Sequence, residues 1–86
     1  MKLKDEFITH DTASESLLVP TGAAEWAGIV RGNRTLEAIL LLLRQQTTEE
    51  EVVAAMRERY DAPEDAIKRD VAYLLGELRR IGALDE

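Results

Sequence analysis

The segment that most constrains the fold is an almost unbroken apolar run at residues 36–43, Leu-Glu-Ala-Ile-Leu-Leu-Leu-Leu. Its apolar residues recur at helical spacing, and Leu41 and Leu42 extend the apolar face to nearly the whole circumference. Such a helix is expected at the centre of the core, packed by a sheet and by other helices. Asn33 is the predicted N-cap, because its side-chain oxygen can accept hydrogen bonds from amides of the first turn. Gln45-Gln46 is predicted to end the helix.

Before this helix the chain carries signals for strands and turns. Residues 7–10 and 17–19 suit strands and flank a turn-forming stretch at 11–16, which predicts two strands joined by a hairpin or a longer loop. A third strand is predicted at 26–31, where β-branched and aromatic residues are interrupted by Gly28. Three strands are too few to close a barrel, so an edge of this sheet must stay open or be covered.

A second helix is predicted after residue 48. Thr48 and Glu51, or equally Thr47 and Glu50, fit a capping box ahead of an apolar stripe. The run of glutamates at 49–51 also suits the positive end of the helix dipole. We favour this capping role over a metal site, because successive helical side chains point about 100° apart and cannot converge on one ion.

The third predicted helix is the longest, and its apolar residues repeat at three- and four-residue steps as far as Ile81. Pro63 suits the first helical position and Gly82 suits the C-cap. Gly76 lies in the helix interior, where glycine costs roughly 1 kcal/mol relative to alanine. Close packing is the favoured reason, and a nearby partner backbone is the alternative. Residues 83–84 are expected to fold back over the core.

The order of elements predicts an α+β fold, with a winged helix-turn-helix-like arrangement of a three-stranded antiparallel sheet followed by three helices. The length of 86 residues predicts one domain over residues 1–86. The sequence shows no apolar stretch long enough to cross a bilayer and no signal-peptide core at its start, so we expect a cytoplasmic protein.

Composition narrows the function. The chain has 17 acidic and 11 basic residues, a net charge of −6, and residues 36–86 carry 12 acidic and 7 basic residues, a net charge of −5. This balance disfavours nucleic acid as the partner. The chain has no cysteine, a single histidine (His10) and only scattered glycines, so we expect no metal site, no cofactor and no phosphate-binding loop. With no catalytic constellation in view, the chain is predicted not to be an enzyme.

Two predicted elements offer a binding surface. The third strand has a backbone free on one side if it lies at the sheet edge, and the third helix carries polar-tipped residues outside its apolar stripe. An extended peptide could add a strand to that edge and place its side chains against the helix. The competing interpretation is that the edge is only protected from unwanted pairing.

Short motifs along the chain together resemble the PqqD-like family, which takes its name from the pyrroloquinoline quinone synthesis protein D. The matching segments are 26–33 (Trp-Ala-Gly-Ile-Val-Arg-Gly-Asn), the apolar helix, 48–53, 60–61, 70–75 and 81–84. They keep the order and spacing of the family's landmarks across about residues 7–84. Gly32 departs from the family, which usually has a larger apolar residue there.

This resemblance implies a peptide chaperone, or RiPP recognition element, for ribosomally made, post-translationally modified peptides. Such a protein binds the leader of a precursor peptide along the third strand, against the third helix, and presents it to a modifying enzyme, often a radical S-adenosylmethionine (radical SAM) enzyme. The implied strand positions are Ala27, Gly28, Ile29, Val30 and Arg31. The implied helix positions are Arg69, Asp70, Tyr73, Leu74 and Glu77.

Each of these residues also has a purely structural interpretation. Trp26 and Leu74 are more typical of core residues than of ligand platforms. Asp70 could pair with Arg31 across the groove or with the neighbouring Arg69, which would add little stability. Arg31 and Tyr73 are the favoured contact residues, because each has an apolar body and a polar tip.

Two other functions stay open at this point. A DNA-binding winged-helix regulator would need a basic recognition helix, which the charge balance disfavours. A dimerisation or adaptor domain would pair the same strand edge with another copy. A monomer and a homodimer that exchanges its N-terminal strands are both compatible with peptide binding.

Overall fold

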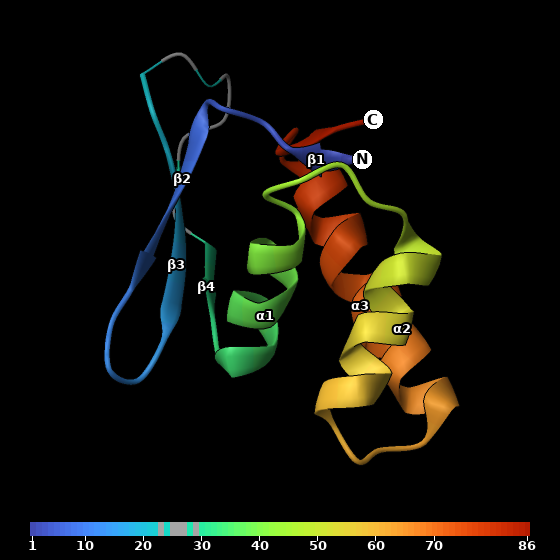
Figure 1. Cartoon of the computed structure of the whole chain (residues 1–86). Coiled ribbons are helices and arrows are strands. Elements are labelled where there is room, and N and C mark those ends of the chain that lie inside the picture. Colours follow the sequence, from blue (N-terminus) through green and yellow to red (C-terminus); the bar gives the residue numbers. More distant parts are fainter. Residues whose placement is uncertain (23, 25–27, 29) are drawn as a thin grey trace.

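The computed structural model describes residues 1–22, 24, 28 and 30–86. The elements in chain order are β1 (Lys2–Leu3), β2 (Phe7–Asp11), β3 (Ser16–Pro20), β4 (Val30–Gly32), α1 (Arg34–Leu42), α2 (Glu49–Arg59), α3 (Glu64–Arg80) and β5 (Leu84–Asp85). Figure 1 shows the sheet of β2, β3 and β4 on one side of α1, with α2 and α3 on the other side. The α+β fold, with a three-stranded antiparallel sheet followed by three helices, is therefore the predicted one.

The main sheet is an antiparallel meander in the order β2-β3-β4. Phe7 pairs with Pro20 at one end of the β2–β3 hairpin and Asp11 with Ser16 at the other, so the first two strands and their turn are as predicted. Ser16 is buried and donates its hydroxyl hydrogen bond to the Asp11 carboxylate next to the turn. The third strand covers 30–32, so it overlaps the end of its predicted range of 26–31 and extends one residue beyond it. Gly28 is not in a strand, contrary to the prediction, and residues 26, 27 and 29 lie outside the described residues.

A second, two-stranded sheet joins the two ends of the chain, and the sequence did not predict it as strands. Lys2 pairs with Asp85 and Leu3 with Leu84. Two-residue strands are too short to show the alternation that marks a strand in a sequence. The expectation that residues 83–84 fold back over the core is met, because both are buried.

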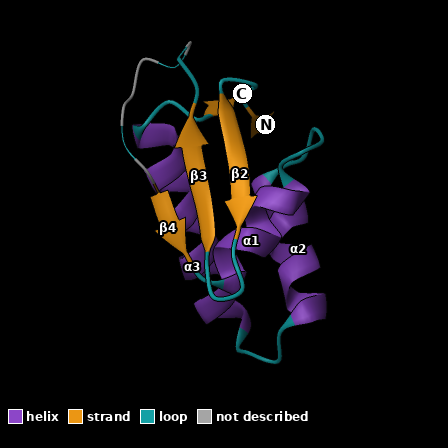
Figure 2. Cartoon of the chain, turned by 90° about the vertical axis from the view of Figure 1, so that its left-hand side faces the viewer, coloured by secondary structure: helices purple, strands orange, loops and turns teal. Residues whose placement is uncertain are grey.

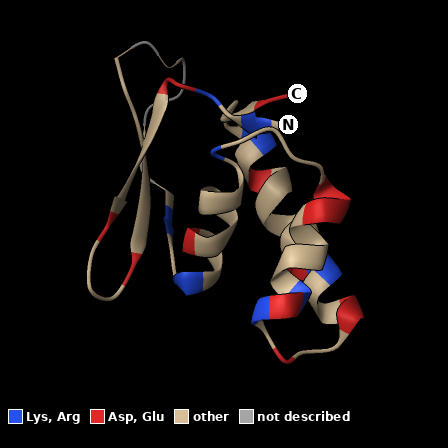
Figure 3. Ribbon diagram, viewed as in Figure 1, with Lys and Arg blue, Asp and Glu red and all other residues tan. Residues whose placement is uncertain are grey.

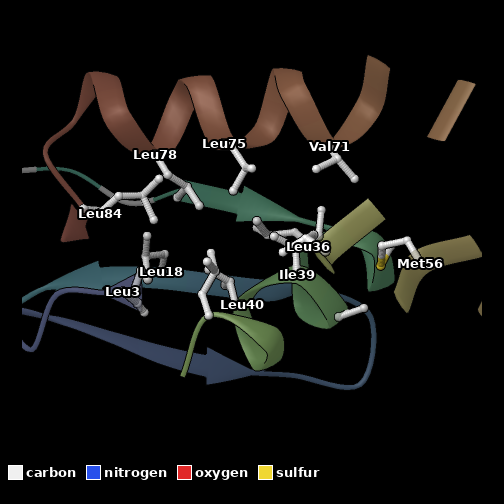
Figure 4. Close-up of a cluster of buried hydrophobic side chains, with 14 of the residues drawn as sticks. Leu3, Leu18, Leu36, Ile39, Leu40, Met56, Val71, Leu75, Leu78 and Leu84 are labelled. Atoms are coloured by element: carbon white, nitrogen blue, oxygen red, sulfur yellow. The ribbon is translucent and has the colours of Figure 1, made fainter. Parts of the chain in front are cut away.

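The core lies between the main sheet and the helices, with α1 at its centre. Leu36, Ile39 and Leu40 of α1 are each no more than 2% exposed. Figure 4 shows them beside Leu18 of β3 and below the buried residues of α3. One part of the prediction is wrong: Leu41 is 42% exposed, because it lines a surface hollow between α1 and β2.

Most helix ends follow the sequence signals, but α1 ends at Leu42 and not at the predicted Gln45-Gln46. The side chain of Asn33 accepts a hydrogen bond from the Thr35 amide, and that of Thr48 accepts one from the Glu51 amide. Pro63 is the N-cap of α3, one residue outside the first helical position predicted for it. Gly82 follows the C-cap with a φ of 75°. The amides of residues 82 and 83 bond back to the carbonyls of residues 79 and 78, the Schellman pattern.

Gly76 does not have the tight packing expected of it. A Cβ atom built there would meet nothing within 4 Å, and the residue lies on the exposed side of α3. Close packing inside the chain therefore does not explain this glycine. The helix bears its conformational cost without a compensating contact from the described residues.

Candidate functional site

The third strand, β4, lies at an edge of the main sheet, which is the condition under which its backbone is expected to be free on one side. Within the described residues, β4 pairs with β3 on one side, and no strand lies on its other side. Figures 2 and 4 show α3 running alongside this edge, and Figure 1 shows the two elements pointing in opposite directions. An open strand edge and a helix flank therefore lie side by side.

The hydrogen-bond alternation of the sheet identifies which backbone groups this edge offers. The Thr21 amide donates to the Glu6 carbonyl and the Thr12 amide to the Glu15 carbonyl, so every second residue of β3 bonds to β2. The backbone groups of the alternate residues 16 and 18 point the other way, toward β4, where these residues pair with Gly32 and Val30. Since antiparallel strands alternate in this way, the amide and carbonyl of Arg31 point away from β3, toward the open side.

The α3 flank beside β4 combines an apolar centre with charged neighbours. Asp70, Leu74 and Glu77 are spaced at i, i+4 and i+7, which places them on one face of the helix. Leu74 is half-buried and packs against the core, as does Val30 of β4. Tyr73 lies next to this stripe and is 67% exposed, the most exposed large hydrophobic residue among the described positions.

The structure does not bring all the predicted site residues to this place. Arg69 lines a hollow of about 540 Å³ between α2 and α3, with Lys68 and Ala72, on the other flank of the buried stripe. Gly28 is exposed, with a φ of 159°, whereas Ala27 and Ile29 lie outside the described residues. The set that shares the β4 edge and the adjacent flank of α3 is therefore Val30, Arg31, Asp70, Tyr73, Leu74 and Glu77. We call it the β4–α3 surface.

Two opposite charges on this surface are unpaired within the described part of the chain. Asp70 forms an ion pair with neither Arg31 nor Arg69, so the pairing considered from the sequence is absent. Glu77 differs, because its carboxylate binds Arg80 at 2.9 Å, one turn further along α3. Arg31 and Asp70 thus remain available to charged or polar groups of a ligand.

The charges of α3 do not form the basic face that DNA recognition needs. The helix contains four acidic and four basic residues, and Figure 3 shows both signs along α2 and α3. Among the described residues, no group of three or more acidic or histidine side chains could hold a metal ion. No helix there has the length and apolar character needed to cross a membrane.

A steric constraint that the sequence did not reveal explains why a glycine stands at position 32, at the end of β4. A Cβ atom on Gly32 would lie 2.5 Å from Cδ2 and 2.6 Å from Cβ of Leu36 in the first turn of α1. The side chain of Leu36 thus fills the space in which a larger residue would stand. The glycine lets β4 approach α1 closely and so fixes where the open edge lies relative to the helices.

Sequence reasoning also overlooked the second open edge. The sequence features that indicate a binding surface lie on the third strand, but the order β2-β3-β4 leaves β2 at the opposite edge of the main sheet. The surroundings of β2 come from α1 and from the segment before β2, and no local sequence pattern could place these two together.

Comparison with known proteins decides the family. Residues 18–84 match the family described as coenzyme PQQ synthesis protein D (PqqD). The chain belongs to the PqqD family. The match begins within β3 and includes β4 and α3, so the β4–α3 surface lies inside the PqqD region. Among curated proteins, no sequence matches the chain.

Two solved structures share the fold of this PqqD-family chain. One, described as TbiB1 in complex with the TbiA(beta) leader peptide, has a TM-score of 0.75 and 21% identity, covering 99% of this chain and 100% of the other. The second, described as lasso peptide synthetase B1 complexed with the leader peptide, has a TM-score of 0.74 and 20% identity, covering 95% and 93%. Each likeness extends over almost the whole of both chains.

Proposed function

We propose that this PqqD-family chain binds the leader segment of a ribosomally made precursor peptide and presents it to a modifying enzyme. The leader adds a strand to the free edge of β4 and lays alternate side chains against α3. Family membership supports this proposal, as do two structures of the same fold that were determined with leader peptides. In this proposal the chain is a cytoplasmic carrier without chemistry of its own, and a radical SAM enzyme is the expected recipient.

The observation that carries the proposal is the free edge of β4 beside a helix flank that suits a peptide. Strand addition needs unpaired backbone groups, which Arg31 supplies, and specificity needs side-chain contacts next to them. Leu74 and Val30 offer an apolar contact, Tyr73 a large exposed ring, and Asp70 an unpaired carboxylate. A bound strand thus has both main-chain partners and side-chain discrimination.

The test is a binding titration with a synthetic, fluorescein-labelled leader of the precursor peptide encoded beside this gene. Fluorescence anisotropy measures its affinity, and amide shifts of the ¹⁵N-labelled chain locate it at 30–32 and 70–77. Arg31→Pro removes the outward amide and leaves the bonds of Val30 and Gly32 to β3 in place. Arg31→Ala retains that amide and removes only the side chain, so the pair separates main-chain from side-chain binding.

Arg31→Pro is expected to weaken leader binding about tenfold or more, because the lost hydrogen bond is worth roughly 0.5–1.5 kcal/mol and the proline ring also obstructs pairing. Tyr73→Ala is also expected to weaken it. Tyr60→Ala is the matched control, since Tyr60 is also exposed but follows α2, away from β4. The proposal fails if the leader does not bind, or if Arg31→Pro and Tyr73→Ala leave its affinity unchanged.

A further inference from the structure

The β2 edge of the main sheet has backbone groups available for pairing. By the same alternation, residues 8 and 10 bond to β3, so the backbones of Thr9 and Asp11 point away from it. Within the described residues no strand lies beside β2 on that side. Ile8, on this strand, is 53% exposed, although large apolar residues are usually covered. Unpaired backbone groups on a strand edge, such as those of Thr9 and Asp11, are a template for pairing with another strand.

The side chains along this edge are ordered by charge. At the start of β2, Lys2, Lys4 and Arg44 line one hollow of about 360 Å³, with Asp5 as its single acidic residue. None of the three cations forms an ion pair within the described part of the chain. This end of the edge therefore has a net positive charge.

The other end of the edge has the opposite sign. Arg44 also borders a second, smaller hollow, in which Asp11 and Glu37 lie with Thr9 and the exposed Leu41. Glu37 and Leu41 lie one turn apart on α1, and Arg44 lies in the turn just after the helix. All three line this hollow with Thr9 and Asp11, so this exposed side of α1 runs beside β2. The order along the edge is therefore cationic, apolar, anionic.

The hairpin beyond the anionic end does not change this order. A separate hollow there is lined by Glu15, Glu37 and Arg34, so acidic residues outnumber basic ones there as well. Figure 3 shows acidic residues at the far end of β2, whereas at its start the acidic residues directly before the strand lie next to basic residues of the preceding segment.

We propose that the β2 edge is the interface of a symmetric homodimer, in which β2 pairs antiparallel with β2 of a second copy. A two-fold axis near Thr9 places the cationic end of each edge against the anionic end of the other. Arg44 then approaches Glu37 of the second copy, and the exposed Leu41 residues approach one another. A symmetric interface must be self-complementary, and this charge order meets that condition. An acidic peptide would match only the cationic end.

The dimer does not compete with leader binding, because β2 and β4 are opposite edges of the sheet. Its combined sheet has the order β4-β3-β2-β2-β3-β4, with both β4 edges still open. The dimer proposal also does not rest on the proposed function. Variants that dissociate the dimer are expected to retain their affinity for the leader, so the two ideas can fail separately.

The test is sedimentation equilibrium of the purified chain over micromolar to millimolar concentrations, at low and high salt. A monomer–dimer equilibrium that weakens as salt rises is expected, because exposed ion pairs are screened. Thr9→Pro removes an outward amide without removing a bond to β3, and it is expected to dissociate the dimer. Arg31→Pro, the same change at the β4 edge, is the matched control and is expected to leave the dimer intact.

A charge exchange provides a second test that does not depend on proline. Arg44→Glu and Glu37→Arg each place like charges against one another, so each variant alone is expected to dimerise about tenfold more weakly or worse. An equal mixture restores both opposite-charge contacts and is expected to form heterodimers, while circular dichroism checks that each variant folds. The proposal is overturned by a chain that stays monomeric at millimolar concentration. A dimer that Arg31→Pro rather than Thr9→Pro dissociates, or a mixture that does not associate, also overturns it.

Discussion

Replacing Gly32 by alanine tests the idea that close approach to α1 positions the β4 edge. The new methyl group would lie 2.5–2.6 Å from two atoms of Leu36, whereas carbon atoms in contact are about 3.5–4.0 Å apart. Relief needs a movement of roughly 1 Å, and Leu36 is only 1% exposed, so it cannot swing into solvent. The end of β4 or the first turn of α1 must therefore move.

Overpacking of this kind costs about 1–3 kcal/mol, and the reduced freedom of the unfolded chain returns about 0.4–1 kcal/mol. We therefore expect Gly32→Ala to lower the free energy of unfolding by about 1–2 kcal/mol. For a chain of this size the midpoint of thermal unfolding should fall by roughly 5–15 °C. Urea and thermal unfolding followed by circular dichroism measure both quantities.

Gly76→Ala is the matched control, because the same methyl group added there meets nothing within 4 Å. It is expected to raise the free energy of unfolding by about 0.5–1 kcal/mol, since alanine favours the helix interior. The two substitutions should thus have opposite signs. A Gly32→Ala variant as stable as the wild type would refute the steric argument for Gly32.

Three further substitutions test the helix ends and the core by the same unfolding assay. Thr48→Ala should lower the free energy of unfolding by about 1 kcal/mol, because the Glu51 amide loses its capping oxygen. Thr47→Ala should lower it less, because the Thr47 hydroxyl makes only a 3.5 Å contact. Equal effects of the two substitutions would contradict this capping assignment. Gly82→Ala should cost roughly 1 kcal/mol because of its positive φ, and an unchanged stability would argue against the left-handed C-cap. Leu75→Ala should cost about 2–5 kcal/mol, since the residue is fully buried, and a loss below 1 kcal/mol would contradict its place in the core.

Much of the fold could be predicted because its signals are local. The apolar run at 36–43 indicated the central helix, and Asn33 and Thr48 indicated helix starts through their own capping bonds. The pairing of β1 with β5 could not be predicted, because it joins ends far apart in the sequence over two residues each. The exposure of Leu41 depends on which helix flank the other elements leave uncovered, and composition alone does not specify that.

The candidate site was predictable as a pairing of elements but less so as a set of residues. Helical spacing places Asp70, Leu74 and Glu77 on one face of α3. That Arg69 lies beside α2, away from this face, becomes clear only when α2 is placed in the fold. The orientation of the Arg31 backbone depends on the register of two strand pairs, which no single segment encodes. The importance of Gly32 likewise appears only when Leu36 is placed next to it.

The pairing of β1 with β5 allows the chain to be connected in a different order. It holds the two ends next to each other, with Lys2 opposite Asp85, and the amino group of Met1 donates to the Thr47 carbonyl at 2.6 Å. A short linker can therefore join residue 86 to residue 1, and new ends can be opened in the exposed turn at 12–15. Such a circular permutant would keep every strand pair in place while beginning and ending beside the β2–β3 hairpin.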